Sequence, residues 1–495
     1  MNVPSRTQAA AIALNRFGLG ARADDSAPPD PKAWLLDQFA RYEPRPAAWA
    51  DQPGAVALAT RFGDERRDLR AEAGQTQASQ PLPAPLPATA STPSAAASAP
   101  ANPAQAARQA VNQAIRKESV GVYRDAVDAR VASALVTPAP FVERLVHFWA
   151  NHFAVSVDKG QVAGLAGAFE LEAIRPHVLG RFEDMLVAAE QHPAMQLFLD
   201  QTRSVGPDSR AALRAEARDP ARKRGLNENL AREIMELHTL GARSGYTQAD
   251  VTEFARALTG WSVAGVRGPQ PNDAPPGAFV FRPALHEPGV RTVLGRRYDQ
   301  DGEAQARAVL QDLARAPATG RHLAFQLARH FVADDPPPAL TERIARAFEQ
   351  SGGDLPTVYR TLVESPEAWS STHAKFKTPW DWTVSSLRGL GWTSLGNLKA
   401  APLLTQLGQP VWRPGSPAGY DDIAASWAAP DALVRRVEVA QRLAARTGDR
   451  VDPRALGTTL FAGTLGDATS TAVSRAESTT TALALLLVSP DFQRR

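Results

Sequence analysis

NENLAREIMELHTLGARSGYTQADVTEFARALTGW, residues 227–261, is the stretch with the densest polar, aromatic and helix-boundary signals in the chain. A helical wheel at about 100° per residue gives its first half one apolar stripe, made of Leu226, Leu230, Ile234 and Leu237. Such a stripe is typical of a helix packed on a core. The loop from Gly241 to Gly245 lets a second helix fold back as a hairpin.

The second helix of the block has marked ends. Thr247 is the expected N-cap, with Asp250 three residues on as a variant of the capping box, and Tyr246 and Val251 are placed as a hydrophobic staple. Gly260 is placed to stop the helix. The buried face is expected to consist of Val251, Phe254, Ala255 and Leu258.

Polar residues gather beside the apolar stripe of the first helix. Asn229, Glu233 and Glu236 share one flank, and Glu228 and Arg232 are spaced for an i,i+4 ion pair. Glu253 and Arg256 of the second helix could face this flank, while His238 lies on the other side. Two interpretations stay open: a site that binds a cation or holds a general acid or base, and a salt-bridge network between helices.

Composition excludes several classes of site. The chain has 495 residues, 44% of them hydrophobic, enough for a sizeable core. It has no cysteine, which excludes disulfides, thiolate zinc sites, iron–sulfur clusters and a cysteine nucleophile. The net charge is only +3, and no Lys/Arg run of the kind found in nucleic-acid-binding arms occurs.

The chain is expected to be soluble. The apolar run from Ala9 to Leu14 is too short and too rich in alanine for a signal peptide, and it is better interpreted as a first helix. No stretch approaches the roughly 20 apolar residues of a membrane-spanning helix. A cytoplasmic location follows from the lack of a visible leader, with a periplasmic or secreted location as the alternative.

The pattern predicts a mainly α-helical domain over residues 1–495. The segment from Ala73 to Ala107 consists almost wholly of Ala, Pro, Ser, Gln and Thr, which predicts a disordered insertion within the domain. Strand signals are few, the best being Ala278 to Phe281 with Arg291 to Leu294 as partner. Helices are expected at Gln105 to Leu135, Phe141 to Phe153, Ala163 to His177, Phe182 to Glu190, Ala194 to Asp200, Gly302 to Arg315, Ala318 to Phe331, Ala339 to Glu349, Leu355 to Val363, Trp380 to Leu390, Asp431 to Ala445 and Ala472 to Leu487.

Two histidines form a second candidate site. His147 and His152 are five residues apart, about 140° on a continuous helix. They can share a metal only if the helix ends between them, and a divalent ion held by His147, His152 and Glu233, or by Glu236, is then expected. The alternative is a pair of packed, hydrogen-bonded histidines.

Other clusters are less specific. His286 and Glu287 follow the expected strand, and a histidine there can act as an acid or base. Lys375 and Lys377 can bind an anion, although solvated lysines are more common. The loop running from Leu407 to Tyr420 could contact a sugar or peptide or pack as a lid. No GxSxG elbow, phosphate-binding loop or dinucleotide fingerprint occurs.

Several segments together resemble a bacterial family known as domain of unknown function 1800. They are LNRFGLG at 14–20, FWANHFAVS at 148–156, the block at 227–261, HEPGVRTVLG at 286–295, AKFKTP at 374–379 and LGQPVWRP at 407–414. The resemblance implies a largely helical protein, often exported, with a neighbouring gene for a protein resembling the sulfatase and alkaline-phosphatase group. It implies no activity. This chain differs by His286-Glu287 where His-Asp is common, by Gly419-Tyr420 where Gly-Trp is common, and by the insertion.

Two hypotheses follow. The first is an enzyme, a metal-assisted hydrolase or oxidase, whose site gathers His147 and His152 as metal ligands and uses catalytic residues from the block and beyond it. The expected catalytic residues are Asn229, Arg232, Glu233, Glu236, Arg256 and His286. The second is a non-enzymatic envelope or assembly protein that binds a sulfatase-like partner, with the same polar residues paired as a buried network. The sequence leaves open whether the chain is an enzyme.

Overall fold

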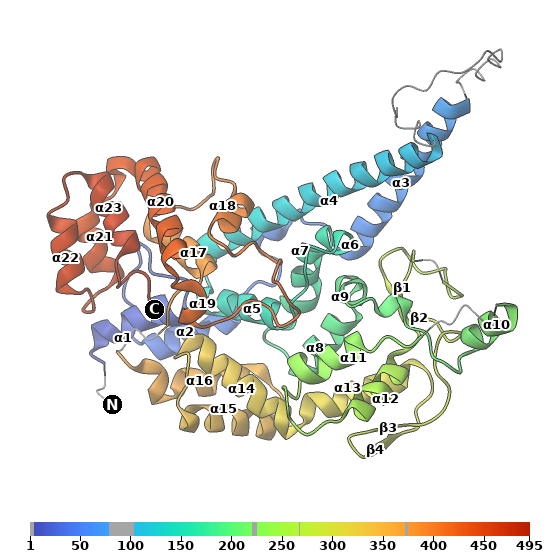
Figure 1. The fold of residues 1–495 in the computed structure, drawn as a ribbon. Helices are drawn as coiled ribbons and strands as arrows, with labels where there is room; N and C mark the ends of the chain where they lie inside the picture. Colours follow the sequence, from blue (N-terminus) through green and yellow to red (C-terminus); the bar gives the residue numbers. More distant parts are fainter. Residues whose placement is uncertain (1–3, 79–102, 220–224, 267, 372–374) are drawn as a thin grey trace, which may run out of the picture.

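The computed structural model describes residues 4–78, 103–219, 225–266, 268–371 and 375–495, and these ranges are mainly helical (Figure 1). They contain twenty-three α-helices and four short strands. The strands form two separate two-stranded antiparallel sheets. The predicted fold class, mainly α with very little β structure, is confirmed.

The first helices lead into a long helical hairpin. They are α1 (Arg6–Ile12), α2 (Pro31–Arg41), α3 (Ala55–Ala78) and α4 (Pro103–Val136). The distal halves of α3 and α4 project from the body of the molecule (Figure 1). The two helices include residues 73–78 and 103–107, the edges of the predicted insertion, because alanine-rich segments favour helix. Residues 79–102, the rest of that prediction, lie outside the described residues.

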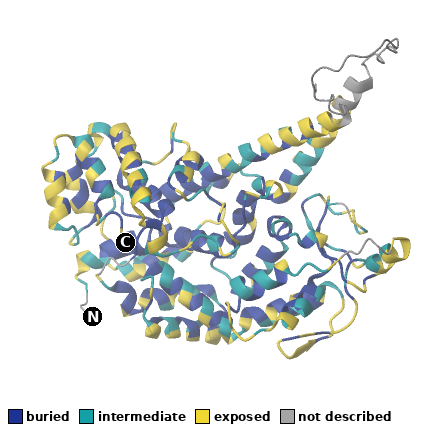
Figure 2. Ribbon diagram, in the orientation of Figure 1, coloured by how far each residue is buried: buried dark blue, intermediate teal, exposed yellow. Residues whose placement is uncertain are grey.

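Helix α5 (Pro140–His152) is the central helix and is buried along nearly its whole length (Figure 2). Pro140 occupies its first turn, where a missing N–H costs nothing. Buried side chains, polar ones among them, lie on all its faces, as expected for a helix enclosed by others. Trp149 donates a hydrogen bond to Tyr359 Oη at 2.6 Å and ties α5 to the core.

The single helix predicted from Ala163 to His177 is broken into pieces. Two short helices, α6 (Gly160–Ala163) and α7 (Ala166–Phe169), are followed by a π-helical turn, η3 (Glu170–Ile174). A Cβ atom at Gly167 would lie 2.4 Å from Ala126 Cβ, so α7 approaches α4 too closely for a larger residue. The chain continues with α8 (Phe182–Gln191), α9 (Pro193–Phe198) and α10 (Arg210–Arg218).

The block at 227–261 forms the expected helical hairpin. Its first half is α11 (Asn229–Glu233) followed by a π-helical turn, η5 (Ile234–His238), and its second half is α12 (Gln248–Leu258). The capping box of Thr247 and Asp250 is present, and Gly260 follows the helix at φ +92°. The predicted ends of this helix are therefore confirmed.

The predicted strand pairing is wrong. β1 (Trp261–Val263) pairs with β2 (Phe279–Phe281), and β3 (Arg291–Val293) pairs with β4 (Arg296–Tyr298). The second pair is a hairpin whose two-residue turn, Leu294-Gly295, has positive φ at both positions. Asp250 accepts a hydrogen bond from Leu294 N at 2.7 Å, so the capping residue of α12 also anchors this hairpin.

The remaining helices form the lower and C-terminal parts of the molecule in Figure 1. They are α13 (Glu303–Arg315), α14 (Pro317–Phe331), α15 (Pro338–Ser351), α16 (Leu355–Glu364), α17 (Pro379–Gly389), α18 (Ala400–Gln406), α19 (Ala424–Trp427), α20 (Pro430–Thr447), α21 (Pro453–Leu460), α22 (Asp467–Ser474) and α23 (Thr479–Val488). The last two replace the single helix predicted from Ala472 to Leu487, because Ser478 begins a new helix by capping Thr481 N. Shorter turns are η1 (Ala13–Phe17), η2 (Ala47–Trp49), η4 (Gln201–Arg203), η6 (Pro366–Trp369) and η7 (Gly448–Arg450).

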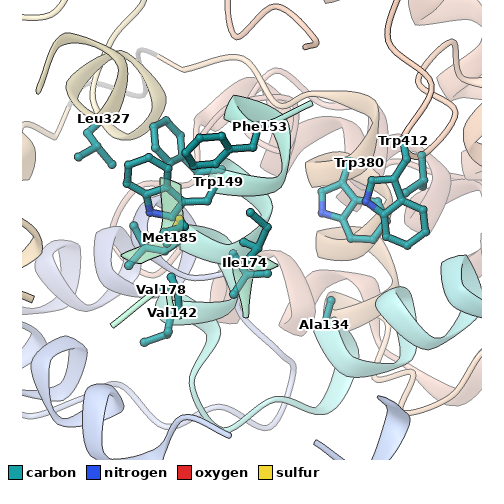
Figure 3. Packing of buried hydrophobic residues seen from close by; sticks show 14 of the residues in the cluster. Ala134, Val142, Trp149, Phe153, Ile174, Val178, Met185, Leu327, Trp380 and Trp412 are labelled. Atoms are coloured by element: carbon teal, nitrogen blue, oxygen red, sulfur yellow. The ribbon is translucent and has the colours of Figure 1, made fainter. Parts of the chain in front are cut away.

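One continuous apolar cluster connects these helices. Figure 3 shows Trp149 of α5 packed with Phe153 and Met185. Trp380 and Trp412 belong to the same core and lie apart from this group. None of the described helices is long and apolar enough to cross a membrane.

Candidate active site

A cavity of about 480 Å³ lies within this helical frame. Most of its wall comes from α4, α5, α14, the start of α17 and residues 407–422, and the segment after α5 and the turn after α11 add Ala154, Val155, Leu237 and Ala242. The polar side chains that line it are Arg130, Arg144, His147, Asn151, His152, His322, Gln326, Arg329, His330, Thr378, Asp381, Gln409, Tyr420, Asp421 and Asp422. Aromatic walls come from Phe148, Phe325, Trp380 and Trp412.

Helical spacing on α5 and α14 explains why these side chains converge. On α5, Arg144, His147 and Asn151 are three and four residues apart and therefore share a face. On α14, His322, Gln326 and His330 are spaced by four residues each and form a polar stripe along the cavity. The opposite face of each helix packs into the apolar core.

Arg130 is held between an ion pair and two indole rings. Its Nε donates to Glu170 Oε2 at 2.7 Å, and its guanidinium lies 4.2 Å from the ring centre of Trp380 and 5.5 Å from that of Trp412. Trp412 Nε1 donates to the same Glu170 oxygen at 3.1 Å. Stacking and charge-assisted hydrogen bonds together fix the plane of this arginine.

Asp381 joins two buried arginines. Arg144 Nη1 donates to Asp381 Oδ1 at 2.9 Å, and Arg495 Nε lies 3.3 Å from Oδ2. Although burial opposes it, the positive charge of these two arginines lowers the pKa of Asp381 below its ordinary value. Asp381 is thus a carboxylate at neutral pH, and Thr378 caps the same helix turn by accepting from Asp381 N.

His147 is held in one tautomer by an indole. Trp380 Nε1 donates to His147 Nδ1 at 3.1 Å, which places the ring proton on Nε2. Nε2 has no hydrogen-bond partner among the described residues, the nearest carboxylate oxygen being Glu143 Oε1 at 3.7 Å. Burial, followed by the charge of Arg130, lowers the pKa of His147 well below its ordinary value. This histidine is a neutral donor.

His330 has the opposite arrangement. Its Nδ1 donates to Asp422 Oδ2, so the lone pair is on Nε2, which lacks a hydrogen-bond partner within the described ranges. Burial lowers the pKa of His330, against the effect of Asp422. Lys375 Nζ lies 3.2 Å from the second oxygen of Asp422 and 2.7 Å from Asp334. His330 is therefore a neutral acceptor oriented by a carboxylate.

The far end of the cavity contains two further histidines. His152 Nε2 donates to the carbonyl of His238 at 3.1 Å, and its Nδ1 lies 3.2 Å from the side-chain amide of Gln326. The same amide is 2.9 Å from His322 Nε2. Burial lowers the pKa of His152 to about 3, so this group is neutral near physiological pH.

A clamp between Asn151 and the loop at 407–422 covers the cavity. Asn151 donates to the carbonyl of Tyr420 at 2.9 Å and accepts from its backbone N at 2.8 Å. Gly419 has φ +80°, and a Cβ there would lie 2.3 Å from the carbonyl oxygen of Asn151. Tyr420, which stands where the resembled family commonly has Trp, also donates to Arg413 O at 2.7 Å. The loop is a packed lid, one of the two expected alternatives.

The candidate residues of the block at 227–261 do not line this cavity. Arg232 pairs with Glu228 at 3.2 Å and with Gln248 at 2.9 Å, as the i,i+4 spacing predicts. Asn229 is exposed, and burial raises the pKa of the half-buried Glu233. Glu236 accepts from Tyr246 Oη at 3.4 Å. These contacts fit the interpretation as a network between helices.

The last two expected catalytic residues, Arg256 and His286, contact residues outside the cavity wall. Arg256 forms an ion pair with Glu253, which also contacts Arg291 at 3.4 Å. His286 Nδ1 donates to Thr259 O at 2.8 Å, and burial lowers its pKa. Neither residue is part of the cavity wall.

The expected metal site is not assembled by the described residues. Among them, no group of three or more His, Asp or Glu side chains is placed to hold a metal ion. Both ring nitrogens of His152 already have partners, and Glu233 does not line the cavity that His147 and His152 share. His147 and His152 therefore line the same cavity, but Glu233, the expected third ligand, does not.

Sequence reasoning missed several cavity residues, namely Arg130, Arg144, His322, His330, Asp381 and Asp422. A signal for one set was present, because HLAFQLARH at 322–330 repeats a polar residue every four positions within an apolar helix. Of the two alternatives for Lys375 and Lys377, the solvated one is wrong, because both side chains are buried; the anion-binding one stays a prediction. Burial lowers the pKa of Lys377 to about 7.

One family model matches nearly the whole chain. A family model described as Protein of unknown function (DUF1800) matches residues 12–494, which include every residue of the cavity wall. The chain belongs to the DUF1800 family. No curated protein and no solved structure matches it. The family therefore confirms the resemblance without supplying a reaction, and the chemistry must be argued from the cavity.

Proposed function

We propose that this DUF1800 protein is a hydrolase that works by general acid–base catalysis in the cavity between α4, α5, α14, α17 and the loop at 407–422. The observation that carries the proposal is the pair of histidines held in opposite tautomers. His330 offers a lone pair on Nε2, and His147 offers a proton on Nε2. An acceptor and a donor in one enclosed space are what hydrolysis needs.

In this proposal His330 is the base that takes a proton from water, and Asp422 orients its ring and stabilises the imidazolium that forms. His147 donates a hydrogen bond to the oxygen on which negative charge develops. Both histidines stay neutral to lower pH than usual, because burial lowers the pKa of each. Proton transfer and water suffice for hydrolysis, so we place it ahead of oxidation.

The test is a panel of 4-nitrophenyl acetate, phosphate, sulfate and glycosides with the purified full chain. His330→Gln and His147→Gln are each expected to lower kcat/KM for any substrate found by about 10²- to 10⁴-fold, the usual contribution of a positioned acid or base. His286→Gln separates the two candidate sites, because His286 lies outside the cavity wall. A loss at His286 with none at His330 would move the site to the β2–β3 region and refute the proposal.

A second candidate is a non-enzymatic assembly protein, favoured by the polar residues of the block at 227–261. Glu228 there accepts from Thr252 Oγ1 at 2.7 Å and from Gln248 Nε2 at 2.7 Å besides pairing with Arg232. Because these side chains bind one another, their role in this candidate is to hold α11 and α12 together. Co-purification with the sulfatase-like partner tests this candidate, and cell fractionation tests the cytoplasmic location against the periplasmic or secreted alternative.

A further inference from the structure

Two arginines in the cavity wall have guanidinium nitrogens left over after their ion pairs form. Arg130 uses Nε for Glu170, and neither of its terminal nitrogens donates to any residue of the described ranges. Arg144 uses Nε for Gly18 O and Nη1 for Asp381, which leaves Nη2 without a partner of that kind. Their side chains are only 8% and 2% exposed, so these charged donors are enclosed with the cavity.

Positive charge is in excess around Asp381. Arg144 and Arg495 both pair with this one carboxylate. Lys377 and Arg436 are buried too, and the charge of the same Asp381 raises the pKa of each against the effect of burial. Asp422 adds a second carboxylate, but Lys375 lies 3.2 Å from it. Burying an uncompensated cation is costly, so an anion in the cavity would be stabilised there.

The shape of the Arg130 site also suits an anion. Trp380 and Trp412 hold the guanidinium at ring-centre distances of 4.2 and 5.5 Å, and Glu170 fixes its inner edge. The outer edge, with Nη1 and Nη2, is thereby pre-organised as a fork. Such a fork matches the two oxygens of a carboxylate, phosphate or sulfate group.

We infer that the cavity binds an oxyanion group of its substrate, a carboxylate, phosphate or sulfate, through the free guanidinium nitrogens of Arg130 and Arg144. The inference rests on the proposed function, because it takes the same cavity as the site. Arg144 lies one helical turn before His147 on α5, and both line the cavity together with His330. An anion bound at Arg144 therefore brings the attached part of the substrate near the two histidines.

The experiment is isothermal titration calorimetry of the full chain with sodium phosphate, sodium sulfate and sodium acetate at constant ionic strength, with glycerol as a neutral probe. At least one oxyanion is expected to bind saturably, one per chain, and glycerol is not. Arg130→Lys keeps the charge beside Glu170 but removes the fork. It is expected to weaken oxyanion binding about tenfold or more, since a charge-assisted bidentate contact is lost.

Arg436→Lys is the matched control. Arg436 is also a buried arginine stacked on aromatic rings, 4.7 Å from the centre of Phe376 and 5.9 Å from that of Trp382. Its terminal nitrogens already donate to Gln493 and to Lys377 O, and it does not line the cavity. Oxyanion affinity in this variant should equal that of the wild type. Equal weakening in both variants would overturn the inference, as would the lack of saturable binding by all three anions.

A second measurement serves if Arg130→Lys fails to fold. Hydrogen–deuterium exchange of the wild-type chain, with and without the bound anion, should show slower exchange in the loop at 407–422 and unchanged exchange in α20. Protection elsewhere and none in this loop would place the anion outside the cavity and overturn the inference.

The two proposals fail separately. An anion that binds through Arg130 to a chain with no hydrolytic activity would support the inference and count against the hydrolase. Hydrolysis that depends on His330, in a chain that binds none of the three anions, would support the hydrolase and refute the inference.

Discussion

Replacing Asp381 with asparagine removes one negative charge from the buried wall of the cavity without changing the size of the side chain. Arg144 and Arg495, which are 2% and 0% exposed at the side chain, then face each other with no carboxylate between them. Breaking a buried pair in this way costs about 3–5 kcal/mol. For a chain of this length, unfolding entropy of about 2 cal/mol/K per residue converts that loss into a Tm lower by roughly 3–5 °C.

The pH dependence of this effect follows from the direction of the pKa shift. The pKa of Asp381 in the folded chain lies below its ordinary value, so its contribution is fully present above the unfolded pKa of about 3.9. It is lost as the pH falls through the folded pKa. The stability difference between wild type and Asp381→Asn should therefore be constant from pH 7 to about pH 5 and should narrow below about pH 4.

Urea denaturation followed by circular dichroism at about pH 7, 5 and 3 measures this difference on both sides of the unfolded pKa. Asp431→Asn is the matched control, because Asp431 also lies in the first turn of a helix and pairs with an arginine, Arg435, but at the surface. Exposed pairs contribute about 0–1 kcal/mol. If Asp381→Asn were no more destabilising than Asp431→Asn, the argument that the buried arginines depend on this carboxylate would be refuted.

Three further predictions concern the frame around the cavity. Thr247→Ala should destabilise the chain by about 1 kcal/mol through loss of the α12 cap, and an unchanged urea midpoint would contradict this; Thr458→Ala, on the exposed side of α21, is the control. Gly419→Ala should loosen the lid, because the added Cβ would collide with Asn151 O. Limited proteolysis should therefore cut this variant within 407–422 faster than it cuts the control Gly415→Ala, whose added Cβ would have no atom within 4 Å. Lys377→Met should raise Tm, and the increase should be larger at pH 6 than at pH 9. The pKa of Lys377 in the folded chain, about 7, lies below its pKa in the unfolded chain, so the wild-type protein gains stability as the pH rises from the first pKa to the second. An equal increase in Tm at both pH values would contradict this.

The helices could be predicted from the sequence because the signals that mark them are local. Thr247, Asp250 and Gly260 mark a helix by contacts within a few residues of each other, and Phe141 to Phe153 is recognisable by its apolar spacing. The break in one predicted helix and the pairing of the strands could not be predicted in this way. The helix predicted from Ala163 to His177 breaks between α6 and α7, where a Cβ at Gly164 would lie 2.6 Å from Phe62 of α3. The partner of β2 is β1, which follows directly after α12. Both depend on contacts between distant segments.

The candidate site was half predicted for the same reason. His147 and His152 were identified from one short segment, and they do lie in the cavity. Their neighbours come from α4, α14, α17 and the loop at 407–422, and no local pattern links Arg130 to Trp412 or His330 to Asp422. The density of polar residues at 227–261 instead marked a set of helix caps and ion pairs, which use the same residue types as a catalytic site.

The contacts of Arg495 have a consequence for how the protein is made. Its side chain reaches Asp381 and also donates to Arg16 O at 3.4 Å, across 479 positions of sequence. A ribosome releases Arg16 and Asp381 long before Arg495, so during synthesis Asp381 must wait without one of its two arginines. The contact between Arg495 and Asp381 therefore forms only once the chain has been synthesised through Arg495, and nascent chains that stop before it should be less stable than chains that contain it.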